Sequence, residues 1–247
     1  MPFNTNPAPL AGRAGGYKYV FIDLDDTLWD FHANARIILN EFYDQQNLQR
    51  YFESFDDYFR IYAKRNLELW DMYGKGEITK EFLNVERFRH PMMQAGIDDM
   101  QLAVKTGTEF IRILPTRTIL IPFAKELLNY LHANYPISIV SNGFVEVQYK
   151  KIESCGMGHY FSHVVLSENA GSLKPDKRIF EYALKLNGAK PSETIMIGDS
   201  YEADIRGAQN AGIDQVYFNS KINVNDTNDL FPATYKINRL EEILRIL

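Results

Sequence analysis

The chain has 247 residues, and its 27 Lys and Arg against 32 Asp and Glu give a formal net charge of −5 at pH 7. Hydrophobic residues make up 45% of the chain and charged residues 24%, which excludes global disorder and supplies enough apolar side chains for a folded core. No stretch approaches the ~18 consecutive apolar residues of a membrane helix, and the mild acidity argues against a surface for a nucleic acid polymer.

Residues 1–16 mix Pro, Asn, Ala and Gly with a single arginine and contain no apolar run. This composition predicts a flexible tail and no signal peptide. The one cysteine, Cys155, cannot form an internal disulfide, so nothing in the chain calls for an oxidising compartment. We therefore expect a cytoplasmic protein without a membrane partner.

Short apolar runs that end in small or polar residues predict strands that are buried on both faces, as in a parallel sheet. Four are clear and a fifth is weaker: residues 19–22, 137–140, 163–166, 194–197 and 215–218. Helical patterns lie between them, over 123–132 and 179–186. This alternation of strand and helix predicts an α/β fold with a doubly wound, mostly parallel sheet.

The interval from 32 to 114 contains helical patterns only. Aromatic residues at three- and four-residue spacing predict an amphipathic helix there: Tyr51, Phe55, Tyr58, Phe59 and Tyr62. Thr79 is expected to cap the next helix, and a last helix ends near Ile113. The predicted organisation is an α/β core of residues 17–31 and 115–247, with a helical cap domain of residues 32–114 inserted after the first strand.

Reactive side chains follow the predicted strands. In open α/β sheets, ligands bind at the carboxyl ends of the strands. The segments found there are Asp23-Leu24-Asp25-Asp26-Thr27, Ser141-Asn142-Gly143, Lys174-Pro175, and Gly198-Asp199-Ser200 with Asp204 shortly after. Crowded carboxylates need a cation to offset their repulsion, and hard oxygen ligands suit Mg²⁺.

These segments resemble the four motifs of the haloacid dehalogenase superfamily, specifically those of its phosphatases with a helical cap of the C1 type. Asp23-x-Asp25-x-Thr27 is similar to the first motif, Ser141 to the second and Lys174 to the third. Gly198-Asp199 with Asp204 is similar to the fourth. All four stand in the family's order, and the match covers nearly the whole chain after residue 16.

The resemblance implies a Mg²⁺-dependent phosphomonoester hydrolase that forms an aspartyl-phosphate on Asp23. It implies a metal site made by Asp23, Asp199 and the backbone carbonyl of Asp25. The Asp25 carboxyl would protonate the leaving oxygen and then deprotonate the attacking water. Because the dehalogenases of the superfamily lack an acid at the position of Asp25, this residue favours phosphate chemistry.

The remaining motif residues are expected to support the transfer. Thr27, Ser141 and Asn142 would hold the phosphoryl oxygens, and Lys174 would neutralise charge on Asp23 and on the transferred group. Asp204 would orient Lys174 or hold metal-bound water, with Ser200 beside it. Neither is expected to bind the metal directly.

The predicted cap carries a second resemblance, to the bacterial pyrimidine 5′-nucleotidase branch. The cap residues that carry this resemblance are Asn66-x-x-Leu69-Trp70-x-x-Tyr73-x-x-Gly76-x-Ile78-Thr79 and Arg87-Phe88. Outside the cap, Trp29-Asp30-Phe31 and Phe144 fit the same branch. This implies a nucleoside 5′-monophosphate as substrate, with pyrimidines preferred. Trp70, Tyr73 and Phe144 are candidates to contact it, although packing within the cap explains Trp70 and Tyr73 equally well.

Other functions remain open from the sequence. The substrate could be another small phosphate ester, such as phosphoglycolate or a sugar phosphate. A phosphomutase uses the same acids. A non-catalytic scaffold that binds a partner is a further alternative, against which the complete set of motifs argues. The sequence carries no signal for an oligomeric state.

Overall fold

The structure is a computed structural model, and it describes residues 16–220 and 233–247. The tail predicted over residues 1–16 lies outside these residues, Gly16 excepted. The described chain divides into two compact units. The first contains the residues up to Asp30, Leu120–Gln148 and those of Gly156–Leu247, and the second contains Phe31–Ile119 and Tyr149–Cys155.

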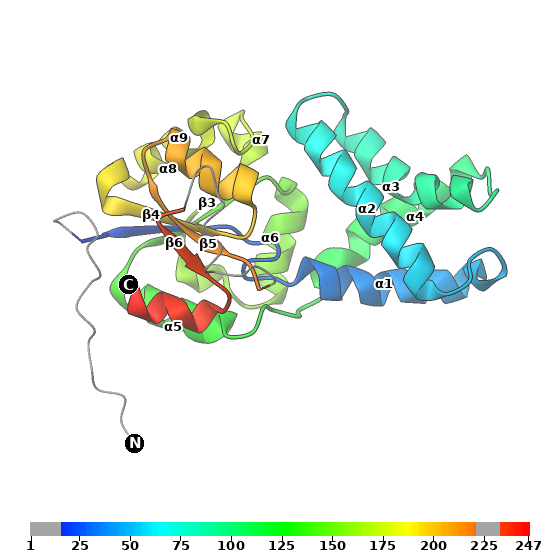
Figure 1. The fold of residues 1–247 in the computed structure, drawn as a ribbon, viewed down its shortest axis with the longest axis horizontal. Helices are drawn as coiled ribbons and strands as arrows, with labels where there is room; N and C mark the ends of the chain where they lie inside the picture. The colour runs from blue at the N-terminus through cyan, green and yellow to red at the C-terminus, as the bar shows by residue number, and fades with distance from the viewer. Residues whose placement is uncertain (1–15, 221–232) are drawn as a thin grey trace, which may run out of the picture. The chain divides into compact units, whose positions relative to one another are not determined.

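The first unit is built on a six-stranded sheet with the order β3-β2-β1-β4-β5-β6 (Figure 1). Each neighbouring pair in it is parallel. The strands are β1 (Tyr19–Ile22), β2 (Ile137–Ser141), β3 (Phe161–Leu166), β4 (Thr194–Gly198), β5 (Asp214–Phe218) and β6 (Tyr235–Ile237). The five predicted strands are thus confirmed. The sequence analysis missed β6, because three residues with a lysine at their centre give no apolar run.

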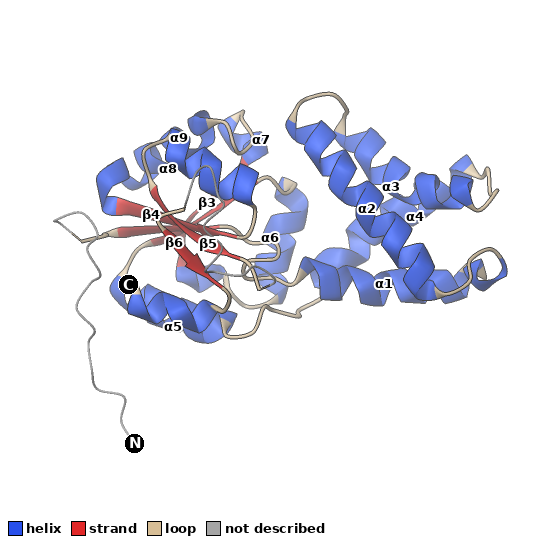
Figure 2. Cartoon of the chain, in the orientation of Figure 1, coloured by secondary structure: helices blue, strands red, loops and turns tan. Residues whose placement is uncertain are grey.

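Helices cover both faces of this sheet, as Figure 2 shows. α8 (Lys177–Asn187) and α9 (Gly207–Asn210) lie on one face, where Phe21, Val140 and Met196 pack against Phe180 and Ala183. α5 (Ala124–Asn134) and the 3₁₀ helix η6 (Leu240–Arg245) lie on the other. The remaining elements are α7 (Ser167–Ala170), η3 (Gly158–Tyr160), η4 (Pro191–Glu193) and a π-helical turn, η5 (Tyr201–Arg206). The helix α6 (Val145–Ser154) begins in this unit, and its residues from Tyr149 onward belong to the second unit.

The winding of the chain determines where a ligand can bind. From β1 the chain builds the sheet outward to β2 and β3, and it then returns to the other side of β1 for β4, β5 and β6. The direction of winding therefore reverses between β1 and β4. In a doubly wound sheet, the crevice outside the carboxyl ends of the strands at this reversal is the place for a ligand.

The second unit is helical and is inserted between β1 and β2. Its helices are α1 (Phe31–Gln45), η1 (Leu48–Arg50), α2 (Phe55–Gly74), α3 (Lys80–Gln94), α4 (Met100–Ile113) and η2 (Leu114–Thr116). The side chains of Ser54, Thr79 and Asp99 accept hydrogen bonds from the first turns of α2, α3 and α4. These N-caps fix the starts of the three helices, and the predicted cap at Thr79 is confirmed.

The aromatic stripe of α2 forms part of the interior of the second unit. Tyr58 and Tyr62 are fully buried, and the Tyr62 ring lies 5.4 Å from Phe88 of α3. The stripe was predicted to begin at Tyr51, which was wrong, because Ser54 caps α2 and the helix begins only at Phe55. Tyr51 therefore lies outside the helix and is 54% exposed.

Close packing of α3 against α4 depends on Gly107. A Cβ at this position would overlap the backbone oxygen of Asn84, which cannot move without shifting α3. We expect Gly107→Ala to destabilise the protein by about 1–3 kcal/mol, the usual cost of overpacking a rigid contact. Denaturant unfolding of the purified variant measures this.

Gly74 provides the matched control, since it is the last residue of α2 and a Cβ there meets nothing within 4 Å. Gly74→Ala should leave stability unchanged or raise it by about 0.5 kcal/mol. Equal unfolding midpoints for the two variants would contradict the packing constraint at Gly107.

None of the helices in the described residues is long and apolar enough to cross a membrane.

Candidate active site

The loop after β1 places acidic residues at the reversal point of the sheet. The backbone N–H of Asp23 still bonds to Ile197 of β4 (2.9 Å), which prolongs the pairing of the two strands. The chain then turns, with Leu28 and Trp29 both donating backbone hydrogen bonds to the carbonyl of Leu24. Trp29 is fully buried and anchors this turn. Asp23 and the residues just after it are thus held on a rigid support.

Lys174 is buried beside Asp23, although it lies 151 residues away in the sequence. Its Nζ donates to Oδ1 of Asp23 (2.6 Å), Oδ1 of Asp204 (2.5 Å) and the carbonyl oxygen of Val140 (2.8 Å). An ammonium group has three hydrogens, so each one has an acceptor. Burial alone would lower the pKa of Lys174, but Asp204 and Asp23 raise it above its ordinary value. The side chain is therefore held as a cation.

Asn142 holds the backbone of Lys174. Its Nδ2 donates to the carbonyl oxygen of Lys174 (2.9 Å), and its Oδ1 accepts from the backbone N–H of Lys174 (2.7 Å). This pair of bonds fixes the loop that presents the lysine. The Asn142 side chain thus holds the Lys174 backbone. Its Nδ2 has a second hydrogen, so the contact with phosphate that we expected of this side chain stays a prediction.

Asp204 reaches Lys174 because Gly198 has no side chain. A Cβ on Gly198 would overlap the carboxyl group of Asp204. The second carboxylate oxygen of Asp204, Oδ2, accepts from the backbone N–H of Ser200 (3.0 Å). Ser200 also caps the following turn, because its Oγ accepts from the backbone N–H of Ala203 (3.2 Å). Asp204 thus contacts the lysine directly, and the backbone of Ser200 holds the other oxygen of Asp204. The expected role of Asp204 in orienting Lys174 stays a prediction, which this contact supports.

Three carboxylates crowd together at this point. Oxygen atoms of Asp23, Asp199 and Asp204 lie within 4.8 Å of one another. Loss of solvation on burial raises the pKa of Asp23 to about 7, against the lowering effect of Lys174. Burial and the charges of Asp204 and Asp23 raise the pKa of Asp199 well above its ordinary value. The site therefore holds more negative charge than its lysine offsets.

The donor set suits a small hard cation. Within the described residues, no Lys or Arg forms an ion pair with Asp199, and only Thr27 is hydrogen-bonded to it, from Oγ1 to Oδ1 (3.1 Å). Oxygen ligands that carry excess negative charge are what Mg²⁺ prefers. The residues present therefore fit the metal that the family resemblance implies. Thr27, expected to hold phosphate, donates its hydroxyl to Asp199.

The hydroxyl of Ser141 is buried at the end of β2, and it belongs to a small network. Oγ of Ser141 accepts from the backbone N–H of Gly143 (3.2 Å) and from Nε2 of Gln148 (2.8 Å). The same Nε2 also donates to Oδ2 of Asp25 (2.8 Å). Ser141, Gln148 and Asp25 thus form one hydrogen-bonded group.

Sequence reasoning missed Gln148. It is fully buried on α6, in line with the buried residues Phe144, Val147, Lys151 and Ile152. A polar residue among apolar residues at helical spacing was the available signal, although no helix was predicted there, because such a residue must find partners in the interior. Its position seven residues after Ser141 pointed in the same direction.

The candidate substrate residues have different surroundings. Phe144 is buried just before the start of α6, in the first unit, with 3% of its surface exposed. Trp70 and Tyr73 belong to the second unit and are half-buried near the end of α2. Their ring centroids lie 5.7 Å apart in an edge-to-face contact. The first unit alone thus brings together Asp23, Asp25, Thr27, Ser141, Asn142, Lys174, Asp199, Ser200 and Asp204.

A doubly wound parallel sheet, a helical insertion after its first strand and a cluster of carboxylates around one lysine together define a Rossmann-like hydrolase with a helical cap. The chain belongs to the haloacid dehalogenase-like hydrolases, whose family model matches residues 17–212. This membership confirms the family that the four motifs indicated.

The similar proteins support the same family. Pyrimidine 5′-nucleotidase YjjG of Escherichia coli is 30% identical over 94% of this chain and 98% of its own. A glyceraldehyde 3-phosphate phosphatase of Methanothermobacter thermautotrophicus is 29% identical over 83% of this chain and 87% of its own. The crystal structure of the HAD-hydrolase YfnB of Bacillus subtilis, bound to magnesium, has a TM-score of 0.83 and 28% identity, and covers 94% of this chain and 98% of that one.

Proposed function

We propose that this protein is a Mg²⁺-dependent phosphomonoester hydrolase in which Asp23 is the nucleophile. The observation that carries the proposal is the buried contact of Lys174 with both Asp23 and Asp204, next to Asp199. A carboxylate can attack phosphorus only if the repulsion between the two anions is offset. A fixed cation at 2.6 Å from Asp23 and an acidic metal site beside it supply that condition.

In the first step, a carboxylate oxygen of Asp23 forms a bond to phosphorus while the bond from phosphorus to the leaving oxygen breaks. Asp25 gives its proton to the leaving oxygen, which departs as an alcohol. The hydroxyl of Ser141 and backbone N–H groups of the loops hold the phosphoryl oxygens. Lys174 offsets negative charge on Asp23 and on the transferred group.

In the second step, water attacks the phosphorus of the aspartyl-phosphate. Asp25, now a carboxylate, takes the proton of this water, and the bond between phosphorus and Asp23 breaks to release inorganic phosphate. Asp204 keeps Lys174 in place through both steps. The Asp25 carboxyl ends the cycle protonated, as it began.

Asp23 and Asp199, together with the backbone carbonyl of Asp25, would hold the Mg²⁺. When bound, the ion offsets the negative charge of the carboxylates and of the phosphate. Asp204 contributes by orienting Lys174, since both of its oxygens already accept hydrogen bonds. The raised pKa values of Asp23 and Asp199 support this assignment, because crowded carboxylates without a cation retain protons.

For the substrate we propose a nucleoside 5′-monophosphate, with pyrimidines preferred. The similarity to a pyrimidine 5′-nucleotidase over nearly the whole chain supports this choice. Trp70 and Tyr73, which the cap resemblance names as substrate residues, are aromatic and half-buried, and stacking of a base on an aromatic ring is worth about 1–3 kcal/mol. The similarity to a glyceraldehyde 3-phosphate phosphatase favours a sugar phosphate as the second candidate.

The test measures phosphate release across nucleoside monophosphates, sugar phosphates and phosphoglycolate, with Mg²⁺ and after chelation by EDTA. We expect the highest kcat/KM with pyrimidine nucleotides, no turnover in EDTA, and recovery when Mg²⁺ is restored. Trp70→Ala should raise KM for the best nucleotide about tenfold and leave the KM for p-nitrophenyl phosphate unchanged.

Each result separates one part of the proposal from the others. Similar rates on all esters would remove the base preference and leave the chemistry intact. A strong preference for triose phosphates would favour the second candidate. Turnover that survives thorough chelation would contradict the metal requirement. Transfer of phosphate within a substrate, without its release, would indicate a phosphomutase, and an inactive protein would favour a scaffold.

A further inference from the structure

Gln148 is an uncharged side chain that joins the proposed acid, Asp25, to the proposed phosphate ligand, Ser141. Its Nε2 donates to both, at 2.8 Å in each case. The residue is fully buried, so these two bonds do not compete with water. A terminal amide has two N–H hydrogens, and this one uses both of them across the site.

These bonds fix the direction of the Ser141 hydroxyl. A hydroxyl oxygen has two lone pairs and one hydrogen. The N–H groups of Gly143 and Gln148 fill both acceptor positions of Ser141 Oγ, at 3.2 and 2.8 Å. Ser141 can therefore act toward a bound phosphate only as a donor. A phosphoryl oxygen is an acceptor, so the hydroxyl is prepared for it before the substrate arrives.

The same amide orients Asp25. Because the N–H of Gln148 is directed at Oδ2 of Asp25, that oxygen is held as an acceptor. A proton on this carboxyl group is then favoured on the other oxygen, Oδ1, because an oxygen that already accepts a hydrogen bond is the carbonyl oxygen of the acid. A carboxyl group held at one oxygen also loses less rotational freedom when it reaches the transition state.

The neighbouring backbone is shaped around this side chain. A Cβ on Gly143 would overlap Nε2 of Gln148 and lie 2.8 Å from its Cγ. Glycine at this position therefore leaves the space that the amide occupies. The remaining polar atom of Gln148, Oε1, is buried and has no hydrogen-bond partner within the described residues. Such an orphaned acceptor is costly, which argues that the amide is held for what its N–H groups do.

We propose that Gln148 is a positioning residue of the hydrolytic reaction, which aligns the general acid Asp25 and makes Ser141 an obligate donor to the phosphoryl group. The inference rests on the proposed function. It goes beyond the four motifs, because Gln148 belongs to none of them. It predicts a selective loss that depends on the leaving group.

Gln148→Met is the first test, since methionine has nearly the same length and no N–H group. We expect kcat/KM to fall about 100-fold for the alkyl phosphate that the wild type hydrolyses best, and only about 10-fold for p-nitrophenyl phosphate. An alkoxide needs the proton of Asp25 to leave, whereas p-nitrophenolate is a stable anion. The dissociation constant for inorganic phosphate in Mg²⁺, measured by calorimetry, should rise about tenfold.

Gly143→Ala displaces the amide without changing Gln148 itself, and it keeps the backbone N–H that serves Ser141. It should show the same leaving-group dependence, and it serves as the test if circular dichroism shows that Gln148→Met does not fold. Gln101→Met, at an exposed position of α4, is the control and should behave as wild type.

An equal fall on both esters with unchanged phosphate affinity would overturn the proposal, because Gln148 would then serve the fold alone. Full activity of both variants would overturn it as well. A wild-type protein that hydrolyses no ester would instead refute the proposed function. In that case the phosphate titration still decides whether Gln148 prepares Ser141.

Discussion

An Asp23→Asn variant is expected to lose hydrolysis of phosphate esters by at least about 10⁴-fold while its fold survives. The amide is nearly the same shape as the carboxylate, but it cannot attack phosphorus. Lys174 keeps Asp204 and the carbonyl oxygen of Val140 as partners, so the interior remains paired. Release of p-nitrophenol from p-nitrophenyl phosphate measures the activity, and thermal unfolding followed by circular dichroism measures the fold.

Asp26→Asn is the matched control, because it makes the same change in the same loop. Asp26 has a backbone φ of 56°, a conformation that asparagine also adopts readily. This variant should keep its activity within a few-fold of the wild type. Normal hydrolysis by Asp23→Asn would show that the nucleophile lies elsewhere.

A Lys174→Met variant is expected to lose both activity and stability, with the loss of stability larger at pH 8 than at pH 5. Removal of the ammonium leaves the buried carboxylates of Asp23 and Asp204 without their cation. Breaking a buried ion pair in this way costs about 3–5 kcal/mol. Denaturant unfolding in EDTA at the two pH values measures the difference.

The pH dependence follows from the direction of the pKa shift. The pKa of Asp23 in the folded metal-free protein is raised to about 7, mainly by burial. An acid whose pKa is higher folded than unfolded makes the protein lose stability as pH rises between those two values. Without Lys174, which lowers the pKa of Asp23, that loss deepens and extends to higher pH. At pH 5 the Asp23 carboxyl is protonated, which relieves its repulsion with the Asp204 carboxylate.

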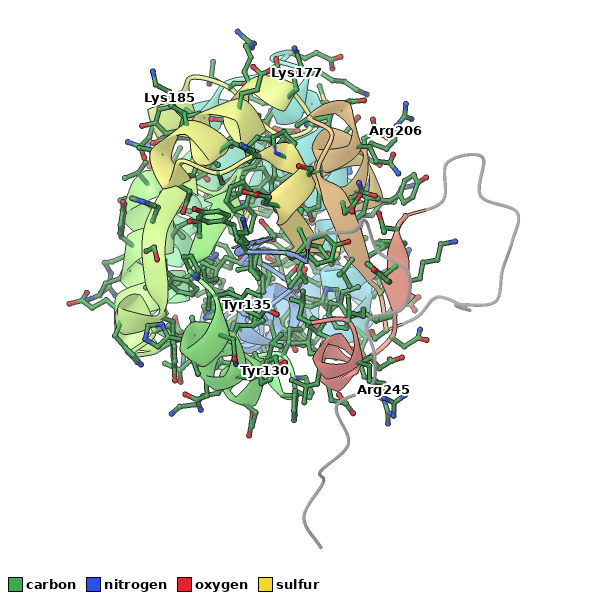
Figure 3. The ribbon with its side chains drawn as sticks, turned by 90° about the vertical axis from the view of Figure 1, so that its left-hand side faces the viewer. Tyr130, Tyr135, Lys177, Lys185, Arg206 and Arg245 are labelled. Atoms are coloured by element: carbon green, nitrogen blue, oxygen red, sulfur yellow. The ribbon has the colours of Figure 1, made fainter. Side chains whose placement is uncertain are left out.

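Lys177→Met is the control for this variant. Lys177 pairs with Glu181 at 2.9 Å, but its side chain is 59% exposed and points outward from α8 (Figure 3). Water solvates both partners there, so the unfolding midpoint should hardly change at either pH. If Lys174→Met lost equal stability at pH 5 and pH 8, the carboxylates around Lys174 would not be the source of its effect.

The sequence by itself was sufficient to locate five of the strands, to predict a mostly parallel sheet and to name the residues that follow the strands. Continuous apolar runs such as Ile137–Ser141 are strong signals, because a strand buried on both faces tolerates few polar side chains. Parallel strands place their carboxyl ends at one edge, so Asp23, Ser141 and Asp199 could be grouped before any coordinates were known. The short strand β6 and the start of α2 gave weaker signals, and both were misjudged.

Only the tertiary structure decided how those residues are paired. Lys174 and Asp23 meet across 151 positions of sequence, and the three acceptors of the ammonium come from three different segments. The hydrogen bonds from Asn142 to the Lys174 backbone and from Gln148 to Asp25 depend on distances of a few ångströms. A linear pattern records which side chains reach one edge of the sheet, whereas hydrogen bonds between them depend on packing, which brings distant segments together.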